Sequence, residues 1–277
     1  MKGHDFFLEI SIFERRCEIH VNGIPLLRDT SGGRIETRLP VNHLLLPGAN
    51  RLEWLIVPDE TDFVPDRVGV DARLMYAAGP GQEPQPVAAL SQKGALPEGS
   101  TEDATGAGPT VLGTAGPVQI WQDARTGLAM VRRDLTLDAP LLRWAWADAS
   151  PIPDGDDVRD SLVEWYRYLH ALLIAGQTDT LIALHAEKCA ELETAYSMDT
   201  DRVLEEIALP YAHLDESWRL QTPDWSASEL DFAADGRLVR LFDPMTGPLI
   251  HYRDAVGLWR SFDFWLRIEG GQWVIAR

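Results

Sequence analysis

The sequence predicts a multidomain protein, with an all-β sandwich in its first half and an α+β domain in its second half. Three observations support this prediction: alternating apolar and polar residues before about residue 147, a helical apolar period from residue 157, and short strand-like segments after Pro210. The length of 277 residues also fits two domains, because one domain typically takes roughly 150 residues. The hydrophobic fraction of 45% and the charged fraction of 25% are those of a globular chain.

The first domain begins with strands whose apolar residues alternate with polar ones. Residues 17–21 (CEIHV) show this period of two, and the following Asn22-Gly23 is a turn signal because both residues tolerate positive φ. We expect further strands at 7–13, 35–39, 52–57, 70–74, 118–121, 128–137 and 141–146. Several short strands at this spacing predict a β-sandwich.

Residues 79–117 interrupt the strand pattern. These 39 positions contain eight glycines, six prolines and no aromatic residue. Such a segment buries too little apolar area to offset the entropy of ordering it. We therefore expect a flexible Gly/Pro-rich excursion of the first domain, because strands resume directly after it. The alternative is a linker between domains.

The domain boundary is expected at residues 148–156. Pro151, Pro153 and Gly155 favour turns over regular structure, and the acidic residues around them suit the N-terminus of a helix. The sequence thus predicts a β-sandwich domain at 1–147, a linker at 148–156 and an α+β domain at 157–277.

The second domain begins with three expected helices and continues as a β-meander. Apolar residues recur every three or four positions from Val158 to Leu173, and we expect this first helix to end at Gly176. A second helix is expected from Thr178 to Tyr196, and a third from Asp199 to about Pro210. Strands are then expected at 218–222, 230–233, 237–243, 249–253, 261–268 and 272–276. This order is an α+β pattern.

Residues 157–277 resemble the NTF2-like superfamily, also called cystatin-like or SnoaL-like. The resemblance rests on the order of elements and on three segments near the end, 238–243 (LVRLFD), 249–253 (LIHYR) and 262–276, with Trp273 and Ile275 on the last strand. It implies a cone of helices on a curved antiparallel sheet, with a pocket inside. It also implies a homodimer formed through the outer face of the sheet, unless the N-terminal sandwich occupies that face.

The first half more weakly resembles galactose-binding-like β-sandwiches, which are jelly-roll modules. The matching segments are 19–25 (IHVNGIP) and 44–53 (LLLPGANRLE). In those modules the corresponding residues serve the scaffold and do not bind sugar. The resemblance therefore implies a jelly-roll-like fold and no ligand.

The resemblance to NTF2-like enzymes implies candidate pocket residues, since such enzymes place an Asp/His pair or a Tyr/Asp set inside the cone. The candidates are Tyr166, His170, His185, Asp243, His251, Tyr252 and Asp263. A carboxylate or imidazole in an apolar cavity can act as a general base, because burial shifts its pKa toward neutrality. Each candidate also has a structural interpretation: a core tyrosine, a hydrogen-bonded histidine, or a surface ion pair of Asp263 with Arg267. No pair matches a family catalytic motif position by position.

Charge and missing motifs exclude several function classes. With 25 basic and 43 acidic residues the formal net charge is −18, and residues 151–277 carry −12 of it, which argues against nucleic acid and anionic membranes as partners. The chain has no GxGxxG, P-loop, HExxH or Cys/His cluster, so we expect no cofactor and no metal. Two separated cysteines, and no signal peptide or membrane span, indicate a cytoplasmic protein.

Three hypotheses about function follow. The first is a non-enzymatic, bacterial-type binding protein whose NTF2-like domain holds a small molecule or a protein partner. The second is a small-molecule isomerase, dehydratase or cyclase that uses the NTF2-like pocket. The third is an acidic immunity-type protein that neutralises a basic partner.

Overall fold

The structure is mostly β, with 46% strand and 22% helix, and its four sheets are antiparallel. It is a computed structural model that describes residues 5–57, 69–79, 82–93, 108–110, 112–123, 125–206, 218–244 and 247–277. The chain divides into two compact units, Met1–Arg143 (unit 1) and Trp144–Arg277 (unit 2). Each unit is described by itself.

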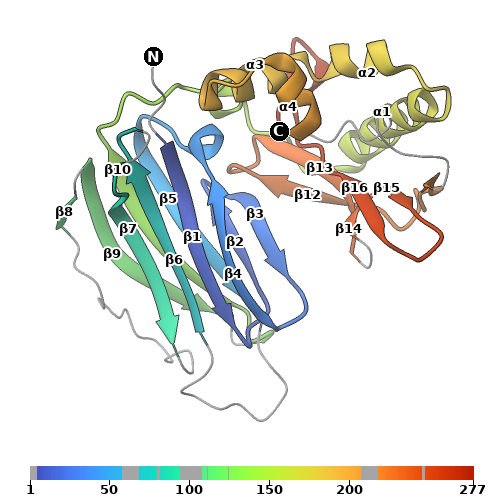
Figure 1. Ribbon diagram of the computed structural model, residues 1–277. Helices are drawn as coiled ribbons and strands as arrows, with labels where there is room; N and C mark the ends of the chain where they lie inside the picture. The colour runs from blue at the N-terminus through green and yellow to red at the C-terminus, as the bar shows by residue number, and fades with distance from the viewer. Residues whose placement is uncertain are drawn as a thin grey trace. The chain divides into compact units, whose positions relative to one another are not determined.

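Unit 1 consists of two antiparallel sheets (Figure 1). One sheet has the strand order β4-β1-β6-β7 and the other has the order β3-β2-β5-β10-β9-β8. The strands are β1 (Asp5–Phe13), β2 (Cys17–Val21), β3 (Ile24–Asp29), β4 (Arg34–Pro40), β5 (Gly48–Ile56), β6 (Gly69–Ala77), β7 (Gln85–Lys93), β8 (Gly108–Thr110), β9 (Gly113–Gln122) and β10 (Ala129–Leu137). A short 3-10 helix, Asn42–Leu44, precedes β5.

Residues that alternate between apolar and polar in the sequence alternate between buried and more exposed positions in the strands. In β2 the residues Cys17, Ile19 and Val21 are buried, while the two residues between them are partly exposed. Both sheets contribute fully buried side chains, including Leu8 from the first sheet and Trp54 from the second. Burying one face of each strand in this way is the main source of stability for a half-buried sheet.

Asn22 ties the turn after β2 to the entry of β5. Asn22 and Gly23 adopt φ angles of 54° and 72°, as the tight turn requires. The Asn22 side chain donates from Nδ2 to the Leu44 carbonyl (2.7 Å) and to Oδ1 of Asn50 (2.9 Å), and it accepts the Arg51 N–H (2.8 Å). The asparagines of both matching segments therefore act as internal hydrogen-bonding groups.

Replacing Asn50 by alanine is expected to lower the free energy of unfolding of unit 1 by about 2 kcal/mol. Its Oδ1 accepts the Leu46 N–H (2.8 Å), and its Nδ2 donates to the carbonyls of Leu46 (2.7 Å) and Gly48 (2.9 Å). Alanine would leave these partly buried groups unpaired, at roughly 1–3 kcal/mol for a buried polar group. Urea unfolding would measure the change. Gln122→Ala, at an exposed position, is the control, and an equal cost for both variants would contradict the prediction.

The expected excursion at 79–117 is wrong where the structure describes it. Residues 85–93 form β7, which pairs with β6 along its length and buries Val87 and Leu90. Residues 108–110 and 113–122 form β8 and β9. The average composition of 39 residues hid the short apolar run around Val87, which is enough for one strand. Residues 80, 81, 94–107 and 111 lie outside the described residues.

Unit 2 contains helices followed by short strands (Figure 1). The helices are a 3-10 turn (Ala145–Asp148), α1 (Asp156–Ile174), α2 (Thr178–Leu184), α3 (Ala186–Tyr196) and α4 (Thr200–Glu206). The strands are β11 (Arg219–Leu220), β12 (Glu229–Ala233), β13 (Leu238–Asp243), β14 (Gly247–Pro248), β15 (Ile250–Arg253), β16 (Trp259–Phe262), β17 (Leu266–Glu269) and β18 (Gln272–Ile275). They form sheets of order β11-β15-β16 and β12-β13-β17-β18, with β14 paired to β13.

Helix α1 supplies one face of the unit 2 core. Its buried residues recur at the expected helical spacing and pack against β13, β15, β16 and β17; they include Leu162, Tyr166 and Leu169. The helix begins after Gly155 with two aspartates in its first turn, and the chain turns away at Gly176 with φ of 63°.

Several details of the expected helices and strands differ from the structure. The strand expected at 261–268 is two strands, β16 and β17, which belong to different sheets, and β3 lies outside the expected strands. The second expected helix is divided at His185 into α2 and α3, and the strand expected at 141–146 is extended chain followed by a 3-10 turn. The division at His185 turns the imidazole into the core, where it is 2% exposed. The third helix is described as far as Glu206, and the remainder of that expectation lies outside the described residues.

Two buried arginines attach α3 to the end of the chain in unit 2. Glu187 and Glu191, one helical turn apart on α3, form ion pairs with Arg267 and Arg277, respectively. Both guanidinium groups are almost fully buried, with side-chain exposures of 6% and 5%. The Glu191 carboxylate also accepts the N–H of Ala145 (3.0 Å), so it connects three segments of unit 2.

Candidate functional site

The seven candidate residues lie at three places in unit 2. Three lie around the core residue Phe264: Tyr166, His185 and Asp263. His170 lies near the end of α1 beside Trp225. The remaining three lie on two strands: Asp243 is the last residue of β13, and His251 and Tyr252 lie on β15. The structure therefore does not bring all seven together in one pocket.

Tyr166 is a core residue whose hydroxyl is used internally. The hydroxyl donates to the Phe264 carbonyl (3.4 Å) and accepts the Leu241 N–H (3.3 Å), so it links α1 to β13 and to the chain before β17. Burial raises the pKa of this phenol well above its usual range. The neutral phenol is thus a structural hydrogen-bonding group.

His185 is a neutral imidazole in the core. Its Nδ1 lies 2.8 Å from the Leu181 carbonyl, and its ring packs against Phe264 with centroids 5.3 Å apart. Burial lowers the pKa of His185 to about 4, although the hydrogen bond to Leu181 opposes this shift. At neutral pH the ring is uncharged, and its Nδ1 proton is hydrogen-bonded to the Leu181 carbonyl of α2.

Asp263, which lies between β16 and β17, is paired with Arg240 on β13. Nη1 of Arg240 lies 2.6 and 2.5 Å from the two oxygens of the Asp263 carboxylate. The same guanidinium contacts Asp231 at 2.9 and 2.7 Å and lies 4.3 Å from the centre of the Trp265 ring. The alternative pairing of Asp263 with Arg267 is wrong, since Arg267 pairs with Glu187 and Glu269.

His170 does not share the surroundings of Tyr166, although four residues separate them. Its Nε2 lies 3.2 Å from the Gln221 carbonyl, and its ring meets the edge of Trp225 at 6.0 Å. Four residues span slightly more than one helical turn, and this rotation leaves His170 half-buried at the edge of the core, whereas Tyr166 points into it.

The candidates on β15 point to opposite sides of their strand. His251 stacks on Trp259 with ring centroids 4.4 Å apart, and burial lowers the pKa of His251 while the nearby charge of Asp243 opposes this effect. Tyr252 is buried against Phe262, and burial raises the pKa of its phenol. These contacts are those of a packed strand.

Lys188 is a titratable group that the sequence did not indicate. It lies on α3, where burial lowers the pKa of its amine to about 8, and the nearby charge of Asp263 partly opposes this effect. In the sequence it stands between Glu187 and Cys189 and looks like any helix lysine. The division of the helix at His185, which the sequence did not predict, orients this face of α3.

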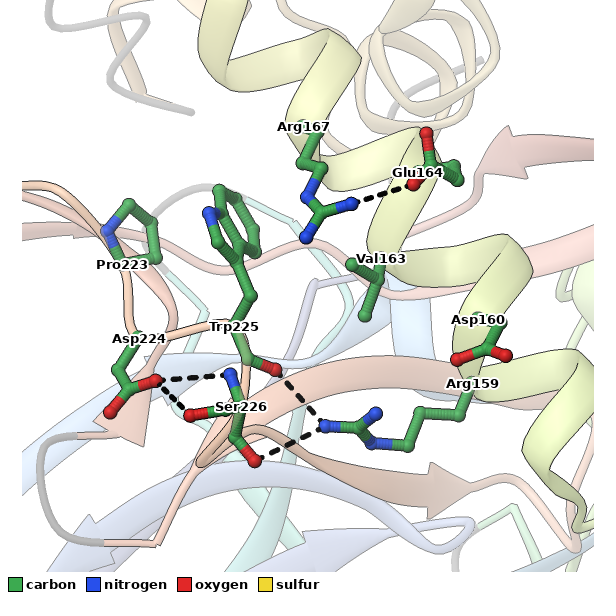
Figure 2. A pocket seen from close by; sticks show the side chains of 9 residues that line it. All are labelled: Arg159, Asp160, Val163, Glu164, Arg167, Pro223, Asp224, Trp225 and Ser226. Carbon is green, nitrogen blue, oxygen red and sulfur yellow. Dashed lines mark hydrogen bonds and ion pairs between the residues drawn. The ribbon is translucent and has the colours of Figure 1, made fainter.

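The described part of unit 2 contains a surface groove beside α1 (Figure 2). It has a volume of about 620 Å³, within the range of small-molecule sites. One side is formed by α1 residues Arg159, Asp160, Val163, Glu164 and Arg167, and the other by Pro223, Asp224, Trp225 and Ser226. None of the seven candidates lines it.

Arg159 holds the two sides of the groove together. Its guanidinium donates to the carbonyls of Trp225 (3.0 Å) and Ser228 (3.0 and 3.1 Å), which attaches the 223–228 segment to α1. Within that segment Asp224 accepts the Ser226 N–H (3.0 Å) and the Ser226 hydroxyl (2.6 Å), as Figure 2 shows. These bonds lower the pKa of the Asp224 carboxyl, so it is ionised near neutrality.

The groove combines an indole with carboxylates. The Arg167 guanidinium lies 5.8 Å from the centre of the Trp225 ring and forms an ion pair with Glu164 (2.7 Å). Arg167 is paired with Glu164, and Arg159 keeps its positive charge although its N–H groups are bound to carbonyls, so three carboxylates and two guanidinium groups leave the groove with one net negative charge beside an aromatic surface. This arrangement suits a ligand that has an apolar part and a cationic group.

The sequence did contain a signal for this groove. Arg159, Val163 and Arg167 recur at a spacing of four, as do Asp160 and Glu164, so one face of α1 has a defined charge pattern. Trp225 could not be found in the same way. It lies between expected strands, and only the fold places it against α1.

The described residues contain neither a potential metal-binding cluster nor a membrane-spanning helix. No group of three or more His, Cys, Asp or Glu side chains among them could hold a metal ion. None of the helices in this part of the chain combines the length and apolar character needed to cross a membrane. Comparisons with protein-family models, with curated proteins and with solved structures give no match to this chain.

Proposed function

We propose that this chain is a non-enzymatic binding protein that takes a cationic, partly apolar ligand in the groove between α1 and Trp225. The ligand is a small amine or a basic side chain of a protein partner. The observation that carries the proposal is the position of the Trp225 indole, which lies against α1 beside carboxylates while both lining arginines are already engaged.

The proposal retains the NTF2-like interpretation of unit 2 and the jelly-roll-like interpretation of unit 1. A long helix packed on antiparallel strands supports the first, because that arrangement is what the resemblance implies. Two sheets and the hydrogen bonds of Asn22 and Asn50 support the second, since these residues serve the scaffold. We also retain a cytoplasmic location, which the two buried free cysteines favour.

The contacts of Tyr166, His185 and Asp263 favour binding over the isomerase-type alternative. Tyr166 and His185 use their polar atoms on backbone carbonyls, and Asp263 is paired with Arg240. A general base must instead reach a proton on the substrate. Lys188 is the one observation that favours the enzyme as a second candidate, because an amine with a pKa of about 8 can exchange protons near neutrality. Steady turnover that is lost in Lys188→Met would support that candidate.

The acidic charge of the second half fits the same class of ligand. Residues 151–277 carry a net charge of −12, and a carboxylate-rich surface raises the local concentration of cations. The third hypothesis, neutralisation of a basic protein, is therefore a special case in which the cationic group belongs to a protein partner.

The charge preference of the groove can be measured with two small probes of similar shape. We expect 2-phenylethylamine to shift the amide resonances of residues 159–167 and 224–226, and phenylacetate to bind at least several times more weakly. The reason is that Asp160 and Asp224 attract the ammonium group and repel the carboxylate. Asp160→Asn should weaken the binding of the amine by roughly threefold, the effect of an exposed ion pair.

Asp179→Asn on α2 is the matched control, because it removes one exposed carboxylate outside the groove. It should leave the affinity for 2-phenylethylamine unchanged. Equal binding of the amine and phenylacetate, or shifts outside the two groove segments, would argue against the proposal.

A further inference from the structure

We propose that the free edge of β16 binds an extended acidic segment of a partner protein, which adds to the β11-β15-β16 sheet as a further strand. This surface is separate from the groove and shares no residue with it. The proposal rests on an open strand edge, on two arginines that face aromatic rings, and on an exposed apolar hairpin tip.

The pairing of β15 shows which main-chain groups of β16 face outward. The Gln221 N–H donates to the His251 carbonyl, so the main-chain groups of His251 point toward β11. Successive residues of a strand alternate, so those of Tyr252 point toward β16, where Tyr252 is opposite Arg260. The N–H and C=O groups of Trp259 and Ser261 therefore point away from β15.

No residue that the structure describes pairs with this outward edge of β16. Further along the chain the same edge is occupied, because Trp265 exchanges main-chain hydrogen bonds with Arg277 and Ala276. The free edge is thus limited to Trp259 and Ser261, flanked by the hairpin turn. An edge of this kind is a template for an added strand.

Two arginines near this edge form no ion pair with a carboxylate in the described part of unit 2. Arg253 lies 5.5 Å from the centre of the Trp259 ring, and Arg260 lies 5.1 Å from the centre of the Trp218 ring. This differs from the buried Arg240, Arg267 and Arg277, each of which has at least one carboxylate partner. Arg253 is opposite Trp259 and Arg260 is opposite Tyr252, so the two arginines point to opposite faces of the sheet and give each face one positive charge, in a half of the chain that is otherwise strongly acidic.

The tip of the hairpin is apolar and exposed. Val256 is 84% exposed, Leu258 62% and Trp259 43%, although the turn itself is fixed by Asp254, which accepts the N–H groups of Val256 and Leu258. An ordered turn that exposes large apolar side chains is a common feature of interaction surfaces.

Charge selects the acidic segment as the occupant. A second copy that paired its own β16 with this edge would bring the arginines of both copies together, and like charges disfavour that pairing. Because Arg253 and Arg260 point to opposite faces of the sheet, a partner strand with acidic residues on both of its faces would place one carboxylate near each arginine, and its apolar residues would lie near Leu258 and Trp259. The N–H and C=O groups of Trp259 and Ser261 would fix which residues of the added strand lie opposite them.

The test is a titration with two acetylated heptapeptides, one of sequence Glu-Glu-Val-Glu-Glu-Val-Glu, which presents carboxylates on both faces of a strand, and one in which Lys replaces each Glu. We expect the Glu peptide to shift the amide resonances of residues 258–262 and to bind at least tenfold more tightly than the Lys peptide. The double variant Arg253→Glu, Arg260→Glu should reverse this preference. Arg202→Glu on α4 is the control and should leave it unchanged.

Three results would overturn the proposal. The first is equal binding of both peptides, or shifts that exclude residues 258–262. The second is self-association in light scattering that the double variant abolishes, which would assign the edge to a second copy. The third is that the protein binds vesicles of phosphatidylserine and neither peptide, and that the double variant loses this vesicle binding. None of them bears on 2-phenylethylamine binding in the groove, which uses other residues.

Discussion

Replacing Arg277 by methionine is expected to lower the free energy of unfolding of unit 2 by about 3 kcal/mol. Arg277 and Glu191 are 5% and 13% exposed in their side chains, so methionine would leave a largely buried carboxylate without its partner. Removing one member of a buried ion pair typically costs about 3–5 kcal/mol. The Arg277 guanidinium also lies 5.5 and 5.8 Å from the ring centres of Trp144 and Trp146, and methionine would lose these contacts.

Urea unfolding followed by tryptophan fluorescence would measure this change, because eight of the ten tryptophans lie in unit 2. The control is Arg167→Met, whose ion pair with Glu164 is 51% and 74% exposed and should contribute less than about 0.5 kcal/mol. Glu191→Gln and the double variant complete a cycle that isolates the pair. A loss in Arg277→Met no larger than in Arg167→Met would contradict the prediction.

Lowering the pH from 6.5 to 4 is expected to destabilise unit 2 by about 3 kcal/mol through His185 alone. The folded-state pKa of His185 is about 4, whereas an exposed histidine titrates near 6.5. Above pH 6.5 the ring is neutral in both states and stability does not depend on it. As the pH falls below 6.5 the unfolded chain binds the proton first, so stability decreases until the folded state is also protonated near pH 4.

The variant His185→Gln separates this effect from that of the carboxylates, which also titrate at low pH. The free energy of unfolding of the wild type should fall more steeply than that of the variant between pH 6.5 and 4, by about 3 kcal/mol in total. Urea unfolding at several pH values would give both curves. Parallel curves would show that His185 is not buried as a neutral imidazole.

The fold could be predicted from the sequence wherever a local period decides the element. The alternation of residues 17–21 became β2, and the apolar stripe from Val158 to Leu173 became the buried face of α1. The turn at Asn22-Gly23 followed from its positive φ requirement. The expectation failed for β7, because composition averaged over 39 residues hid a short apolar run around Val87.

The candidate site could not be predicted in the same way, because its contacts join residues far apart in the sequence. Arg240 on β13 reaches Asp263 because the fold brings β13 near the segment between β16 and β17, while spacing alone suggested Arg267. Trp225 meets α1 across more than fifty residues of chain, and no local pattern connects them. His185 was found as a candidate, but its role depends on a break in the helix that its sequence does not show.

The central claim is that ligand binding takes place in the surface groove and not in the interior of unit 2. Amide shift mapping of 2-phenylethylamine on Trp225→Ala and Lys188→Met tests it most directly, since the first variant removes the indole of the groove and the second removes the titratable amine of the interior. The account predicts that Trp225→Ala abolishes the shifts at residues 159–167, while Lys188→Met retains them with unchanged affinity. Binding that survives in Trp225→Ala and is lost in Lys188→Met would contradict it.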